Sequence, residues 1–195
     1  MLKEKLKDFH IILASGSPRR QQFFKELGIE FEVRLKPVEE NFPSELQGSE
    51  ITDYLAELKA AAFEGELNTG DILITSDTIV WHQNAALGKP SDPVQALEMI
   101  KSISGRTHKV ITSVCFKTQE KTRTVNCTTR VSFSKLSEEE IKFYLDEFRP
   151  FDKAGAYGIQ EWIGLIGIEY IEGSYFNVVG LPTHLVYKNL LEITS

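Results

Sequence analysis

The sequence predicts a single α/β domain. Segments with the spacing of amphipathic helices alternate along the chain with short apolar or alternating segments typical of strands. No linker rich in proline, glycine and serine, no low-complexity block and no internal repeat interrupts this order. The 195 residues suffice for one substantial core but are few for two independent domains. We therefore expect one domain over residues 1–195, divided at most into two lobes.

The first elements are a strand and a helix joined by a short turn. The apolar run from His10 to Ala14 predicts the strand, and a Ser/Gly turn ends it. Ser17 is a natural N-cap and Pro18 suits the first helical position, so a helix begins here. Gly28 is a plausible stop for this helix, and residues 29–33 predict the next strand.

A second helix and a buried strand follow. Apolar side chains recur on one helical face from Glu50 to Leu67, and Ser49 precedes them as a cap. Ile72-Leu73-Ile74 is a continuous apolar run, which favours a strand buried on both faces. We expect this strand to end in Ser76-Asp77-Thr78, which would place polar side chains at a strand end.

The middle of the chain predicts a helix and a β-ribbon. Asp92 and Pro93 form a helix start, and Gly105 ends that helix. Two alternating segments, residues 110–116 and 125–133, then predict paired strands joined by a polar turn around Gln119.

The last third begins with a further helix start. Ser137 and Glu140 have the spacing of a capping box. A glycine-rich loop from Asp152, a strand from Trp162 to Ile171 and a closing helix after Pro182 are expected to follow.

Composition excludes several classes of protein. The chain has 28 acidic and 22 basic residues and a formal charge of −6, which disfavours binding to nucleic acid or to anionic lipid. Cys115 and Cys127 cannot form a disulfide framework, and we expect them to be small buried hydrophobes in a reducing compartment. No membrane-length apolar run and no signal-peptide pattern is present, so we expect a cytoplasmic protein.

Common catalytic motifs are also missing from the sequence. It has no Walker loop, no Rossmann glycine motif, no His-Glu-x-x-His and no Cys-x-x-Cys. The four histidines are scattered without ligand spacing, and we assign none of them chemistry.

The turn before Pro18 predicts an anion site. A helix N-terminus offers free N–H groups, and Arg19 and Arg20 add two guanidinium groups that fit the helix dipole poorly unless an anion is present. Other polar residues fall in predicted loops or at element ends, and together they indicate a phosphate-handling site. They are Glu39, Glu40, Lys59, Asp77, Thr78, Lys89, Pro90, Asp152, Lys153 and Gln160. Taken singly, most of these residues would be ordinary caps or solvated surface side chains.

Six phrases, in this order along nearly the whole chain, resemble the signature motifs of the Maf family. They are Leu-Ala-Ser-Gly-Ser-Pro-Arg-Arg (13–20), Ser-Asp-Thr-Ile-Val (76–80), Gly-Lys-Pro (88–90), Ser-Gly-Arg-Thr-His (104–108), Asp-Lys-Ala-Gly-Ala-Tyr-Gly-Ile-Gln (152–160) and Val-Gly-Leu-Pro (179–182).

The resemblance implies a nucleoside triphosphate pyrophosphatase that releases a nucleoside monophosphate and pyrophosphate with a divalent metal, Mg²⁺, Mn²⁺ or Co²⁺. It also implies a mixed, strongly bent sheet with flanking helices, forming two lobes around a cleft as in inosine triphosphatases, and in many members a homodimer. Arg19, Thr78 and Gln160 match the branch associated with dTTP and UTP. Glu161, where glycine is usual, and Ser76, where alanine is common, depart from the pattern, as does the 83–86 turn, which lacks a common Asp-Gly.

The resemblance, together with the chemistry of these side chains, gives expected roles to ten residues. Asp77 is the expected general base, Lys59 and Lys89 are further catalytic residues, and Glu40 with Asp77 holds the metal. The expected substrate-binding and specificity residues are Ser15, Arg19, Arg20, Thr78, Lys153 and Gln160.

Two alternatives stay open at this point. One is a regulator of cell division or septum formation that binds the nucleotide without hydrolysing it. The other is a phosphatase or a sugar-phosphate enzyme. The carboxylates of Asp77 and Glu40 favour the pyrophosphatase, because an acid near a triphosphate hinders binding unless a metal or catalysis uses it.

Overall fold

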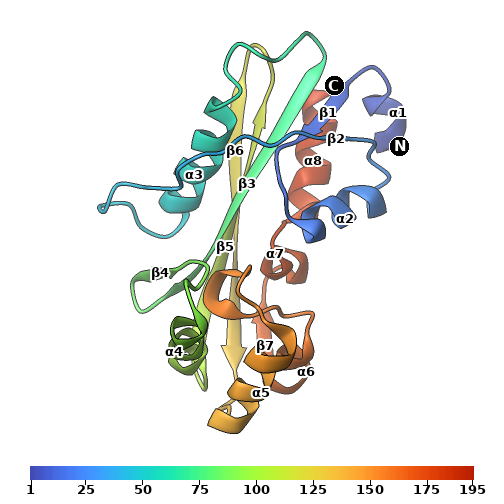
Figure 1. The fold of residues 1–195 in the computed structure, drawn as a ribbon. Helices are drawn as coiled ribbons and strands as arrows, with labels where there is room; N and C mark the ends of the chain where they lie inside the picture. The colour runs from blue at the N-terminus through green and yellow to red at the C-terminus, as the bar shows by residue number, and fades with distance from the viewer. The chain divides into compact units, whose positions relative to one another are not determined.

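The computed structural model describes all 195 residues and shows a seven-stranded mixed sheet with flanking helices (Figure 1). The strands are β1 (His10–Leu13), β2 (Glu32–Val33), β3 (Asp71–His82), β4 (Ala85–Leu87), β5 (Thr107–Lys117), β6 (Thr122–Phe133) and β7 (Ile168–Glu172). The helices are α1 (Leu2–Leu6), α2 (Pro18–Glu26), α3 (Ser49–Ala61), α4 (Pro93–Ile103), α5 (Glu138–Phe148), η1 (Ala154–Ala156), α6 (Trp162–Gly167), α7 (Tyr175–Val179) and α8 (Thr183–Ile193).

The sheet has the strand order β2-β1-β3-β5-β6-β7, with β4 paired to β3. β1 pairs in parallel with both β2 and β3, whereas the β3–β4 and β6–β7 pairs are antiparallel. The predicted α/β class is therefore confirmed.

The chain divides into two compact units. Unit 1 comprises Met1–Asp77, Thr112–Cys127 and Gly180–Ser195, and unit 2 comprises Thr78–Ile111 and Thr128–Val179. The strands β3, β5 and β6 contribute residues to both units, and within β3 the boundary falls between Asp77 and Thr78.

In unit 1, β1 and β3 are buried on both faces. On one face, Ile72 and Ile74 pack in a cluster with Phe24 of α2 and Leu190 of α8. On the opposite face, Leu73 packs with side chains of α3. The alternation of side chains along a strand explains this division, and Figure 1 shows α3 across β3 from α2 and α8. The two-sided burial predicted for residues 72–74 is confirmed.

In unit 2, the loop at η1 passes close to β3. Gly155 adopts φ +68°, and a Cβ atom on it would lie 2.7 Å from a methyl carbon of Val80. Its N–H donates to the Gly88 carbonyl at 3.0 Å. Only glycine satisfies both the positive φ and the close approach, so the glycine-rich sequence here is a requirement of packing.

Several predicted helix boundaries are confirmed. Ser17 caps α2, Asp92 caps α4, and Ser137 with Glu140 forms the capping box of α5. Gly105 has φ +65° just beyond α4, as expected of a residue that ends a helix. Cys115 is fully buried as predicted, whereas Cys127 is half-buried.

The helix predicted from Glu50 to Leu67 is shorter and differently capped. It begins at Ser49 with Gly48 as its N-cap, and it ends at Ala61. The strand predicted over residues 29–33 is likewise reduced to the two residues of β2, which pair with Ile12 and Leu13 of the short strand β1.

The predicted strand end at Ser76-Asp77-Thr78 is wrong, because β3 runs on to His82. Gln83 and Asn84 adopt positive φ values of 50° and 59°, the geometry of a tight hairpin turn. That turn brings β4 back onto β3, with Val80 opposite Leu87. The three polar residues therefore lie in the interior of a long strand.

The predicted strand from Trp162 to Ile171 is also wrong in its first half, where α6 forms. β7 begins to pair at Ile168, opposite Phe133, which is the last residue of β6. Residues 162–167 therefore have no strand beside them, and a helix satisfies their backbone groups instead. A short apolar run cannot be assigned from its spacing alone. The short helices α1 and α7 were not predicted.

Unit 2 should lose stability in acid because it buries His108. Its Nε2 lies 2.7 Å from the Tyr157 hydroxyl, and burial, with a smaller effect of His82, lowers the pKa of His108 from 6.5 to about 3. The unfolded chain binds this proton near pH 6.5 and the folded chain does not, so stability falls as the pH drops through that window. We expect a loss of about 2 kcal/mol between about pH 7 and pH 5.

Urea unfolding at both pH values measures this loss. The variant His108→Gln should show a smaller dependence on pH, and His184→Gln, at an exposed position of α8, should match the unchanged protein. Equal pH dependence in all three proteins would contradict the prediction.

Candidate functional site

The turn between β1 and α2 is fixed by its own serines. Ser17 accepts a hydrogen bond from the Arg20 backbone N–H at 3.5 Å, and Pro18 occupies the first turn of the helix. The buried Ser15 hydroxyl accepts from the Ser17 N–H at 3.3 Å. The predicted arginine-headed helix start is therefore present, with Arg19 and Arg20 in its first turn.

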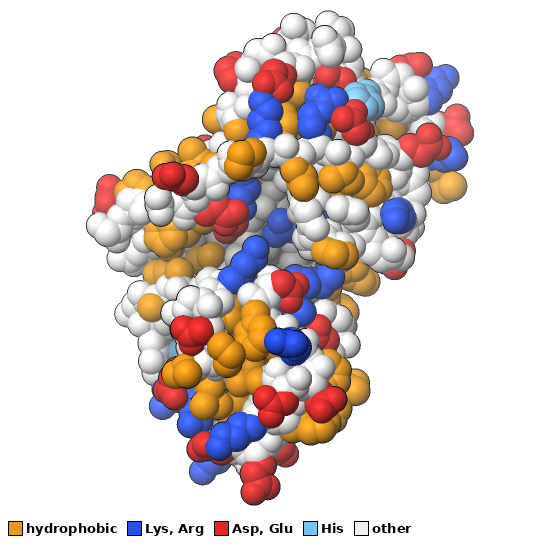
Figure 2. All heavy atoms as spheres, in the orientation of Figure 1, with side chains coloured by type: hydrophobic (Ala, Val, Ile, Leu, Met, Phe, Trp, Pro, Cys, Tyr) orange, Lys and Arg blue, Asp and Glu red, His pale blue; other side chains and the backbone are white.

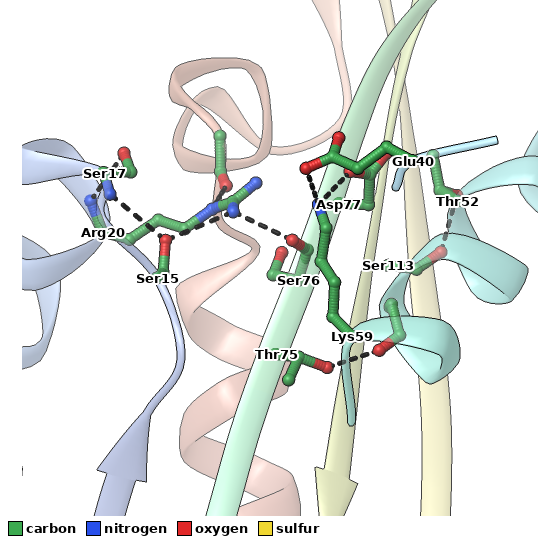
Figure 3. A network of polar contacts seen from close by, with 12 residues as sticks. Ser15, Ser17, Arg20, Glu40, Thr52, Lys59, Thr75, Ser76, Asp77 and Ser113 are labelled. Carbon is green, nitrogen blue, oxygen red and sulfur yellow. Dashed lines mark hydrogen bonds and ion pairs between the residues drawn. The ribbon is translucent and has the colours of Figure 1, made fainter. Parts of the chain in front are cut away.

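Arg20 ties three segments of unit 1 together (Figure 3). Its Nε donates to the Gly180 carbonyl at 2.9 Å, and its Nη1 donates to the Ser76 carbonyl at 2.9 Å and to the Ser15 hydroxyl at 3.4 Å. Burial lowers the pKa of Arg20, and the Asp77 carboxylate partly offsets this effect. A bidentate guanidinium is suited to bridging carbonyls of separate segments. No pattern in the sequence indicates this bridging role.

Lys59 lies between two carboxylates (Figure 3). Its Nζ is 2.7 Å from Oδ1 of Asp77 and 3.1 Å from Oε1 of Glu40. The Asp77 side chain is only 9% exposed, whereas that of Glu40 is 51% exposed. The contact between α3 and β3 thus places a nearly buried acid beside an ammonium group, and a second acid reaches the same group from the loop before α3.

Further polar contacts hold α3 against the sheet. Thr75 donates to the Ala56 carbonyl of α3 at 2.6 Å, and Thr52 of α3 lies 2.6 Å from the Ser113 hydroxyl. These three hydroxyl-bearing residues are fully buried. Thr75 and Asp77 share the face of β3 that meets α3, so the same docking that satisfies Thr75 brings Lys59 to Asp77. Sequence reasoning missed this group because its members are ordinary threonines and serines.

The structure thus gathers six of the sequence-predicted site residues in unit 1: Ser15, Arg19, Arg20, Glu40, Lys59 and Asp77. The charges of Asp77, Arg19 and Glu40 act on the pKa of Arg20, so these groups lie within electrostatic reach of it. The other four belong to unit 2: Thr78, Lys89, Lys153 and Gln160.

In unit 2, Thr78 is half-buried on β3, and Lys89 is exposed in the loop after β4. Lys153 is buried, with Nζ 2.8 Å from Asp152 and 3.0 Å from Glu161. Gln160 is exposed at the end of the same loop.

No group of three or more His, Cys, Asp or Glu side chains with the arrangement of a metal site occurs in the structure. Glu40 and Asp77 are two carboxylates that converge on one cationic group. Mg²⁺ in proteins often takes one or two carboxylates and completes its shell with water and substrate phosphates. The residues present therefore fit a cation that is shared with a phosphate ligand, and they do not fit an all-protein metal cage.

The fold and site define an α/β protein whose middle strand carries a nearly buried aspartate, held by a lysine and neighboured by an arginine-headed helix. The chain belongs to the Maf-like protein family, whose model matches residues 10–193.

Relatives that align with this chain over nearly their full length share one description, dTTP/UTP pyrophosphatase. The chain is 63% identical to a dTTP/UTP pyrophosphatase of Flavobacterium psychrophilum, with full coverage of both chains. It is 62% identical to one of Flavobacterium johnsoniae, over 97% of this chain and 98% of the relative. It is 47% identical to one of Bacteroides fragilis, over 95% of this chain and 96% of the relative.

The fold also resembles that of a solved structure, the Ham1 protein of Staphylococcus aureus. The TM-score is 0.53 at 15% identity, over 92% of this chain and 99% of that chain, which shows a shared fold alone. None of the eight α-helices has the length and apolar content that crossing a membrane requires.

Replacing Arg20 by lysine should destabilise the protein. A single ammonium cannot reproduce the bonds to the Gly180 and Ser76 carbonyls, and leaving such groups unpaired costs about 1–3 kcal/mol. We expect Arg20→Lys to lower the free energy of unfolding, measured in urea, by about 2 kcal/mol.

Arg123→Lys is the matched control. Arg123 forms an exposed ion pair with Glu192, and such pairs contribute less than about 1 kcal/mol. If both variants lose the same stability, Arg20 does not have the bridging role described above.

Proposed function

We propose that this protein is a nucleoside triphosphate pyrophosphatase that converts dTTP and UTP to the monophosphate and pyrophosphate. The single observation that carries the proposal is the nearly buried Asp77 carboxylate, ion-paired to Lys59 in the unit that also holds the arginine-headed start of α2. The description shared by relatives that are 63% and 62% identical over essentially the whole chain supports it.

Binding the triphosphate requires local positive charge. The substrate brings roughly four negative charges to a chain whose own formal charge is −6. On the face shown in Figure 2, both basic and acidic side chains are exposed. We assign the phosphates to Arg19, Arg20 and Ser15, with the free N–H groups of α2.

Asp77 is the proposed general base. A water molecule attacks the α-phosphorus, its proton passes to the Asp77 carboxylate, and the bond from the α-phosphorus to the bridging oxygen breaks. The electron pair of that bond leaves with pyrophosphate, whose charge Lys89 and the arginines stabilise. Lys59 donates to Oδ1 of Asp77 and so orients the carboxylate, which leaves Oδ2 as the oxygen that takes the proton.

Glu40 and Asp77 are the residues that would hold a divalent cation, Mg²⁺, Mn²⁺ or Co²⁺. When bound, the cation supplies charge neutralisation at the phosphate oxygens and a lowered pKa for bound water.

Arg19 and Gln160 are proposed to take part in recognition of the base. The Gln160 amide offers a donor and an acceptor, which match O4 and N3–H of uracil or thymine. Thr78 and Lys153 complete the proposed set of specificity residues.

Product analysis tests the proposal. With dTTP or UTP and Mn²⁺, the protein should release pyrophosphate, and Asp77→Asn should lower kcat by about a hundred- to ten-thousand-fold while remaining folded. Asp146→Asn, at an exposed position of α5, is the control and should keep full activity. Release of orthophosphate would favour a phosphatase, and nucleotide binding without hydrolysis would favour a regulator.

Gln160→Ala should weaken the choice of base. Cytosine presents an amino group and an unprotonated N3 where uracil presents O4 and N3–H, so an amide that reads this edge separates UTP from CTP. Loss of one such hydrogen bond changes preference by about five- to hundred-fold. The ratio of kcat/KM for UTP to that for CTP measures the effect, and an unchanged ratio would remove Gln160 from the specificity residues.

A further inference from the structure

The loop that carries Gln160 contains a largely buried ion pair whose acidic member, Glu161, has no role in the proposed function. Lys153 Nζ lies 3.0 Å from Oε1 of Glu161, and the two side chains are 10% and 20% exposed. Asp152, at 2.8 Å, is a second partner but is 58% exposed. Removing one partner of a buried pair leaves a costly unpaired charge, so Glu161 and Lys153 hold each other in place.

Tyr144 of α5 holds the second carboxylate oxygen of Glu161. Its buried hydroxyl donates to Oε2 of Glu161 and accepts from the Gly158 backbone N–H at 3.0 Å. Burial, with the neighbouring Glu161 carboxylate, raises the pKa of Tyr144 far above its usual value, so the hydroxyl stays a neutral donor. Gln160 therefore lies between two residues, Gly158 and Glu161, that are both bonded to one rigid helix side chain.

Gly158 shows how closely the side chains pack here. A Cβ atom on Gly158 would lie 2.9 Å from Nε2 of Gln160 and 2.9 Å from Cδ of Glu161. The Gln160 amide and the Glu161 carboxyl group therefore lie over the same Cα atom. A shift of Glu161 would open space next to the Gln160 amide and relax its position.

We propose that Glu161, fixed by Lys153 and Tyr144, is a positioning residue that sets the Gln160 amide for base recognition. This inference rests on the proposed function. It adds to that function by naming the residues that make the Gln160 amide selective for the base. When an amide lies on a mobile loop, binding orders the loop and the lost conformational entropy reduces the affinity. An amide that is already held in place loses little conformational entropy on binding.

The test compares three single variants on UTP and CTP. Glu161→Gln removes the charge that holds Lys153, and Tyr144→Phe removes the hydroxyl while keeping both charges of the pair. Glu138→Gln is the matched control, because Glu138 forms exposed ion pairs with Lys101 and Lys142 in the same unit.

We expect Glu161→Gln and Tyr144→Phe each to lower the UTP to CTP ratio of kcat/KM by about tenfold. The change should arise mainly as a higher KM for UTP, with kcat changed less than about threefold, because the reacting phosphates are not disturbed. Glu138→Gln should leave the ratio unchanged.

An unchanged ratio in folded Glu161→Gln and Tyr144→Phe, with Gln160→Ala still altering it, would overturn the inference and leave the proposed function intact. Equal loss of kcat on both nucleotides, in proportion to a lowered Tm, would show a merely structural role and would also overturn it. Failure of the unaltered protein to release pyrophosphate would overturn the proposed function itself.

Discussion

The contact between α3 and β3 is the constraint on which the rest of the site depends. Lys59 reaches Asp77 because Thr75, two residues earlier on the same face of β3, donates to the backbone of α3. A buried hydroxyl without a partner is costly, so the bond at Thr75 fixes the level at which the helix docks. The Asp77 carboxylate is therefore held by packing across the sheet, and its orientation does not depend on the exposed loop that carries Glu40.

Arg20 holds the edge of β3 that lies beyond the end of β1. The Ser76 carbonyl accepts from Arg20, which also bonds Ser15 and Gly180, so the turn after β1 and the approach to α8 are fixed to the middle strand. One strand thus presents an acid toward α3 and a backbone acceptor to α2. The long central strand makes this possible, since β3 continues past Ile74, where its pairing with β1 ends, and the Ser76 carbonyl can then bond Arg20.

The parts of the fold that the sequence could predict are those set by local chemistry. The start of α2 follows from Ser17 and Pro18, and the start of α5 from its capping box, because these bonds join residues three positions apart. The ion pair of Lys59 and Asp77 spans 18 residues and exists only once α3 docks. The helix α6 was missed for a similar reason, since its backbone depends on where β6 ends. The motifs named candidate residues, but spacing alone could not show which of them meet.

Each unit contains one nearly buried lysine between two acids. Lys59 lies between Asp77 and Glu40, and Lys153 between Asp152 and Glu161. Each lysine is therefore outweighed by its own partners and adds little free positive charge for a polyanion. Unit 1 contains three cationic site residues, Arg19, Arg20 and Lys59, and two carboxylates, those of Asp77 and Glu40. The net positive charge of these groups is small compared with the roughly four negative charges of a triphosphate. A divalent cation that arrived with the phosphates would supply the missing positive charge, and the two carboxylates could then bind it as well as Lys59. The small amount of free positive charge in unit 1 is thus an argument for a metal-bound nucleotide as the ligand.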